Sequence, residues 1–198
     1  MGGASLHAAL RSGGPVSLDH LDNFVDGAAV GRIGTLPFAA LARFSADKRV
    51  LWFWFAPFAG LVEQSRGVIA AHAPQLRLLA LDSDRRLGAV DGGGVFVTTW
   101  GSVAARNVES RRARSSGDDG QALDALLAEA RRDGVRIGCV VDEAHHGFHK
   151  AAQARAFFSE VLKPDYALMM TATPRDADIV EFERATGYRV GVPGDWSS

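Results

Sequence analysis

Short apolar runs that alternate with longer helix-like stretches are the feature of this sequence that most constrains its fold. Several runs are apolar at successive positions, as is typical of strands covered on both faces of a sheet; the runs cover residues 50–55, 76–81, 95–99, 135–141 and 166–170. Helix-like segments lie between or after them, at residues 58–71, 121–132, 151–162 and 176–186. This alternation predicts an α/β fold in three layers, with a mostly parallel sheet and helices on both faces.

The length and the charge limit what this chain can be. A chain of 198 residues has room for one domain, and we expect it at residues 21–198, after a weakly patterned segment at residues 1–20. The 22 Lys and Arg residues nearly cancel the 23 Asp and Glu residues, giving a net charge of −1. Bulk charge therefore gives no argument for binding nucleic acid or an anionic membrane.

Hydropathy and cysteine usage indicate the compartment. No apolar stretch approaches the roughly 18 to 20 residues that span a bilayer, so we expect no membrane partner. Cys139 is the single cysteine, which excludes an intramolecular disulfide and any cysteine-clustered metal site. We expect a cytoplasmic protein.

Two acids follow the apolar run at residues 135–141. Ligands bind beyond the carboxyl ends of strands in an open parallel sheet, where Asp142 and Glu143 would lie. One acid there can hold Mg²⁺, and the next can orient or deprotonate an attacking water. The alternative is a simple turn or helix start, which also favours acids. Thr171 and Thr173 follow the next run and place two hydroxyls at the same edge, with turn chemistry as their alternative.

The order of these motifs resembles that of superfamily 2 DEAD/DEAH-type helicases and translocases, in the branch of bacterial restriction subunits and repair helicases. Residues 142–145 read DEAH and residues 171–174 read TATP, like motifs II and III. Residues 56–64 are similar to motif Ia, and residues 95–100 to motif Ib. The resemblance implies a RecA-like, P-loop NTPase-type sheet and ATP hydrolysis that drives movement on nucleic acid, with DNA as the expected partner.

The resemblance also implies a role for each matching residue. Asp142 would hold the Mg²⁺ of bound ATP, Glu143 would polarise the attacking water, and His145 would link the nucleotide site to a partner domain. Thr171 and Thr173 would couple the nucleotide state to the grip on nucleic acid. The segments that would run along the nucleic-acid backbone carry Pro57, Gln64, Thr98 and Thr99.

The chain departs from the family at the phosphate loop. Gly31, Gly34 and Thr35 stand where the nucleotide-binding loop is expected, but Gly34 occupies the place of its lysine. Three interpretations follow: a degenerate loop, an altered or truncated N-terminal region, or partial substitution by Arg32. Arg and Lys differ in shape and reach, so we favour the first two.

A second RecA-like domain, on this chain or on a partner subunit, is also required by such motors. Only 25 residues follow Thr173, so it does not fit here. The expected function is a helicase ATP-binding domain carried as a fragment or a degenerate copy. The alternative is a non-catalytic nucleic-acid- or protein-binding module that has lost ATP turnover.

Two further patterns have simpler explanations. Glu143 with His145, His146 and His149 has spacings found in metal sites, but such histidines are more often solvated in a loop. The aromatic run at residues 52–55 could stack on bases, yet its place in a central strand favours core packing.

Overall fold

The structure, a computed structural model, describes residues 5–10, 49–86, 93–104, 113–114, 122–143, 151–171, 176–187 and 189–191. The strands within these residues are β1 (Ser5–Leu10), β2 (Val50–Ala56), β3 (Arg77–Leu79), β4 (Gly94–Thr99), β5 (Arg136–Val141), β6 (Tyr166–Thr171) and β7 (Arg189–Gly191). The helices are α3 (Ala59–His72), α6 (Leu123–Arg132), α7 (Ala152–Ala156) and α8 (Asp176–Thr186), with a 3₁₀ turn η1 (Trp100–Ser102) and a π-helical segment η4 (Phe157–Leu162).

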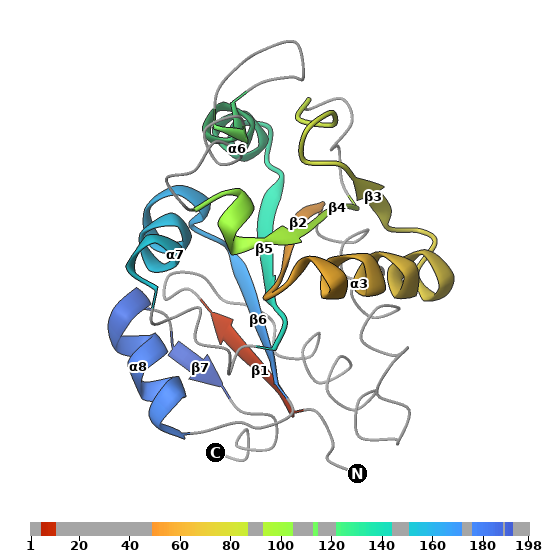
Figure 1. Cartoon of the computed structure of the whole chain (residues 1–198). Helices are drawn as coiled ribbons and strands as arrows, with labels where there is room; N and C mark the ends of the chain where they lie inside the picture. Colours follow the sequence, from red (N-terminus) through yellow and green to blue (C-terminus); the bar gives the residue numbers. More distant parts are fainter. Residues whose placement is uncertain are drawn as a thin grey trace.

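The strands form one sheet in the order β3-β4-β2-β5-β6-β1-β7 (Figure 1). The five strands from β3 to β6 are mutually parallel, and β1 pairs antiparallel with both β6 and β7. The mostly parallel sheet expected from the apolar runs is therefore confirmed. Strand β1 lies within residues 1–20, where the sequence pattern indicated no element.

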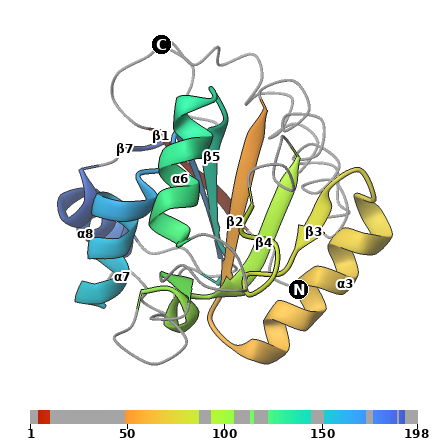
Figure 2. The ribbon, with the colours of Figure 1, turned by 90° about the horizontal axis from the view of Figure 1, so that it is seen from above.

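Helices cover both faces of the sheet, which confirms the three-layer α/β fold. Figure 2 shows α3 on one side and α6, α7 and α8 on the other. The side chains of β2 alternate between these two layers. Phe53 and Phe55 join a core cluster with Leu126 of α6, whereas Trp52 and Trp54 pack with Ile69 of α3. Strand β2 is buried on both faces because both of its side-chain rows meet a helix layer.

The aromatic run of β2 packs in the core, as its central position predicts. Trp52 and Phe55 are both essentially inaccessible to solvent. The ring of Phe55 stacks on the Trp100 indole of η1 with a centroid separation of 3.7 Å. This contact fixes the first turn after β4 against the end of β2, and it removes the aromatic run from consideration as a base-stacking surface.

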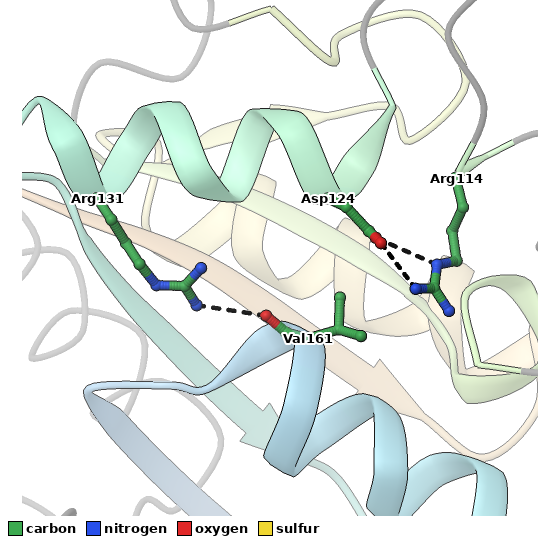
Figure 3. A network of polar contacts seen from close by, with 4 residues as sticks. All are labelled: Arg114, Asp124, Arg131 and Val161. Carbon is green, nitrogen blue, oxygen red and sulfur yellow. Dashed lines mark hydrogen bonds and ion pairs between the residues drawn. The ribbon is translucent and has the colours of Figure 1, made fainter.

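A polar contact holds two helices together on the face opposite α3. The Arg131 guanidinium of α6 donates to the carbonyl oxygen of Val161 near the end of η4 (Figure 3). It also donates to the carbonyl oxygen of Leu162, the last residue of η4. The last carbonyls of a helix have no partner within it, so Arg131 satisfies groups that would otherwise be left without one. Among the residues that the structure describes, no helix is long and apolar enough to cross a membrane.

Candidate functional site

The strand order places a topological switch point between β2 and β5. These strands are neighbours, yet β2 leads through α3 to β3 on one side, while β5 leads through α7 and η4 to β6 on the other. In open α/β sheets, ligands commonly bind beyond the carboxyl ends of the strands at such a point. The residues that follow β2 and β5 are therefore the candidate site.

The register of the strands sets the spacing along this edge. Thr99 at the end of β4 pairs with Ala56 of β2, and the Asp142 amide donates to the Phe55 carbonyl oxygen at 2.9 Å. Thr99 and Asp142 thus flank the end of β2 on opposite sides. Two strand spacings separate them, which is about 10 Å.

Asp142 is partly buried beneath this edge, on the side of the sheet that faces α3. Its Oδ1 accepts the Glu143 amide at 2.9 Å. Burial raises the pKa of the Asp142 carboxyl group, and the nearby Glu143 charge adds to that rise. The hydrogen bond from the Glu143 amide opposes this rise in the pKa, and the nearby polar groups of Trp54 and Ser65 oppose it more weakly.

Glu143 follows in a left-handed backbone conformation, with φ of 48°. Residues other than glycine rarely adopt this region, and each costs about 1–2 kcal/mol there. Such residues persist only where their surroundings fix them, and they are concentrated at functional sites. Glu143 is also half-buried, so its carboxylate lies at the margin between the edge and solvent.

Hydroxyl groups line the β4 part of the edge. Thr98 is 7% exposed and lies inside the fold. The Thr99 hydroxyl lies 3.1 Å from the Ser102 hydroxyl, in the turn that follows β4. Ser102 is a site residue that the sequence motifs did not single out.

The first turn of α3 also opens onto this edge. Its N-cap residue Phe58 is 57% exposed and gives no side-chain cap to the helix. Pro57 is half-buried just before the helix, and Gln64 is exposed on it. Thr171 ends β6 at the same edge of the sheet, two strands from β2.

Several residues named from the sequence lie outside the described residues. They are the nucleotide-loop residues Gly31, Gly34 and Thr35, the motif residues His145 and Thr173, and the further candidates Arg32, His146 and His149. Among the residues that are described, no three His, Cys, Asp or Glu side chains are grouped as a metal site would need.

The motifs missed Trp54 of β2 and Ser65 of α3, the two side chains whose polar groups lower the pKa of the Asp142 carboxyl group. The alternation of side chains along β5 could have predicted that Trp54 lies on the same face of the sheet as Asp142. Val140 and Trp54 are paired across β5 and β2 and belong to the same cluster. A side chain two positions after Val140 returns to that face of the sheet.

Comparison with known proteins finds relatives named as biosynthetic L-threonine dehydratases. The chain is 65% identical over 116 residues to a biosynthetic L-threonine dehydratase of Mycobacterium leprae. It is 50% identical over 121 residues to that of Corynebacterium glutamicum and 38% over 118 residues to that of Mycobacterium tuberculosis. These matches cover 54 to 56% of this chain and 27% of each relative, so the chain spans about a quarter of their length. No family model and no solved structure matches it.

These relatives overturn the interpretation as a superfamily 2 helicase. The ATP-binding domain function is wrong, and so is its alternative, a nucleic-acid- or protein-binding module. The expected cofactors, ATP and Mg²⁺, are therefore also wrong. The expected partners, DNA and a second RecA-like domain or subunit, are wrong for the same reason. The physical reason is that DEAH and TATP consist of residue types that any turn after an apolar strand favours. Asp142, assigned to Mg²⁺, instead accepts a hydrogen bond from its own turn and faces α3.

Proposed function

We propose that this chain is part of an amino-acid-metabolising protein similar to the L-threonine dehydratases, and that its sheet edge binds a small amino acid such as L-threonine. The observation that carries the proposal is the identity of 38 to 65% to three such enzymes over more than half of the chain. The side chains that would meet the ligand are those of Glu143, Thr99 and Ser102, at the switch point and beside it.

The chemistry of the edge suits an amino acid. The Glu143 carboxylate is complementary to an ammonium group, and the first turn of α3 is complementary to a carboxylate because its amides carry partial positive charge. The paired Thr99 and Ser102 hydroxyls can exchange hydrogen bonds with a hydroxyl such as that of threonine.

Binding, rather than catalysis by this segment alone, is what the described residues support. Removal of water from an amino acid is chemistry that pyridoxal phosphate supplies when a lysine holds it. Lys163 is the only lysine among the described residues; it is exposed and lies just before β6, at the edge opposite Asp142. The described residues therefore do not fit that group, and its catalytic chemistry is not assigned to them.

Two further parts of the proposal concern the whole chain. Residues 21–198 form a single domain, with β1 of the preceding segment joining its sheet. The protein is located in the cytoplasm, which the free thiol of the buried Cys139 supports.

The test is a calorimetric titration of the chain with L-threonine and with L-2-aminobutyrate, which lacks the hydroxyl. We expect L-threonine to bind more tightly, and Glu143→Gln to weaken it roughly tenfold or more, the loss expected for one charged hydrogen bond. The matched control is Glu160→Gln, since Glu160 is exposed on η4. No binding of L-threonine at millimolar concentration, or equal effects of the two variants, would contradict the proposal.

A further inference from the structure

Asp142 and Glu143 are adjacent in the sequence but have different surroundings. Along β5, Val140 packs in the cluster beneath α3, and Val141 packs in the cluster beneath α6. Asp142 returns to the α3 side, where the polar groups of Trp54 and Ser65 lower the pKa of its carboxyl group. Ser65 is 7% exposed, and the Trp54 indole nitrogen is buried. The carboxyl group of Asp142 is therefore directed into the fold rather than toward a ligand.

The hydrogen bonds of Asp142 join the end of β2 to the turn after β5. Its amide donates to the Phe55 carbonyl oxygen of β2, and its Oδ1 accepts the Glu143 amide of its own turn. On the α3 side, the Ser65 hydroxyl lowers the pKa of its carboxyl group. The Glu143 amide makes its hydrogen bond to Oδ1 of Asp142 with Glu143 in the left-handed conformation, at φ of 48°. A hydrogen bond to a charged group is among the stronger ones in proteins, so it can offset the cost of the left-handed conformation.

We propose that Asp142 is a positioning residue, which fixes the turn that presents Glu143 at the sheet edge and ties α3 to β5. Glu143 is then the carboxylate that meets the ligand. The ligand part of this inference rests on the proposed function, whereas the positioning part can be measured without any ligand.

The variants separate hydrogen bonding from shape. Asp142→Asn keeps an Oδ1 acceptor for the Glu143 amide, and Asp142→Leu keeps a similar volume without one. Asp165→Leu is the matched control, because the Asp165 carboxylate also accepts a backbone amide, that of Ile137 at 2.9 Å, but at the opposite edge. The readouts are amide hydrogen exchange by NMR and the chemical shift of the Trp54 indole proton. Urea unfolding of each variant corrects the exchange rates for global stability.

We expect Asp142→Asn to leave the exchange rate of the Glu143 amide within about threefold of the wild-type rate. Asp142→Leu should raise that rate roughly tenfold more than its loss of global stability explains. Asp165→Leu should speed exchange of the Ile137 amide and leave the exchange rate of the Glu143 amide unchanged. Should Asp142→Leu not fold, Ser65→Ala is measured instead, and it should shift the Asp142 carboxyl carbon and the Trp54 indole proton. Unchanged Glu143 exchange in folded Asp142→Leu, or unchanged shifts in Ser65→Ala, would overturn the positioning role.

Titration with L-threonine separates this inference from the proposed function. If the exchange pattern is as expected and L-threonine binds none of the proteins, the positioning role stands and the proposed ligand is wrong. If L-threonine binds the wild type and Asp142→Leu does not change the exchange rate of the Glu143 amide, the positioning role is wrong and the proposed function stands.

Discussion

Gly138 lies in the middle of β5, directly against the indole ring of Trp52. A Cβ atom at this position would overlap the ring, which is itself 1% exposed and has no open space to move into. We expect Gly138→Ala to lower the free energy of unfolding by roughly 1–3 kcal/mol, the usual cost of overpacking a core. Urea unfolding followed by tryptophan fluorescence measures the change.

The control for this substitution is Gly67→Ala in α3. A Cβ atom at Gly67 meets nothing within 4 Å. Alanine in a helix interior is more favourable than glycine by up to about 1 kcal/mol, so this variant should be slightly more stable than the wild type. Equal effects of the two substitutions would mean that the contact between Gly138 and Trp52 is not as close as described.

Asp142 predicts a pH dependence of stability. Burial raises its pKa in the folded chain above the ordinary value, so the folded state binds its proton more readily than the unfolded state does. The destabilising effect of the buried charge is fully present above the raised pKa, and it disappears as the pH falls toward the ordinary value of 3.8. Asp142→Asn should therefore stabilise the chain relative to wild type more at pH 7 than at pH 4.

Comparing the two proteins at each pH by urea unfolding isolates this group from the other carboxylates. A stability difference that stays constant from pH 4 to pH 7 would mean that Asp142 ionises equally easily in the folded and unfolded chain.

The elements show how far the sequence determines this fold. Each of the five apolar runs contains a parallel strand. Continuous apolar residues need cover on both faces, and the central strands β2, β4 and β5 have it, whereas the edge strand β3 is partly exposed. Strand β1 was not foreseen, since its pairing with β6 joins residues about 160 positions apart and no local pattern encodes that. The π-helical turns of η4 were likewise expected to be ordinary helix.

The sequence predicted the position of Asp142 and Glu143 after β5, but not the side chains around them. Val141 ends a buried strand, so Asp142 and Glu143 had to lie at the carboxyl edge. Their roles depended on which side chains face them across the fold. Trp54 and Ser65 are 77 or more positions away from Asp142 in the sequence. Short motifs do not contain this information, and this is why the helicase resemblance misled.

Two arginine contacts at α6 differ in burial and predict different contributions to stability. Arg131 donates to the backbone at the end of η4, whereas Arg114 pairs with Asp124 while 38% and 48% of their side chains stay exposed (Figure 3). Arg131→Met should lower the free energy of unfolding by about 1–2 kcal/mol, because it leaves carbonyls unsatisfied. Arg114→Met should cost less than about 1 kcal/mol, as exposed ion pairs do.

Thermal unfolding of both variants tests this difference. Methionine keeps most of the apolar stem of arginine, so the comparison isolates the guanidinium. A larger loss for Arg114→Met than for Arg131→Met would assign the stabilising role to the exposed pair instead.

On the scale of the whole molecule, the central strand β5 is shielded from solvent by the strands and helices around it. Cys139 of β5 is 0% exposed, lies between β2 and β6, and belongs to the cluster that packs beneath α6. Burial raises the pKa of its thiol well above the ordinary value, so the reactive thiolate is suppressed as well as shielded. A thiol reagent can reach it only when the central strands separate.

Labelling of Cys139 with a thiol reagent at pH 8 should therefore report the opening of the sheet as a whole. We expect the native chain to react at least about a hundredfold more slowly than the urea-unfolded chain, since opening of a core strand approaches the global free energy of unfolding. Gly138→Ala should speed labelling by the factor that its loss of stability predicts, about tenfold for each 1.4 kcal/mol, while Gly67→Ala should not speed it. Native labelling as fast as unfolded labelling would contradict the placement of β5 at the centre of the sheet. A Gly138→Ala rate that did not follow stability would indicate that Cys139 becomes exposed by a local opening, without separation of the whole sheet.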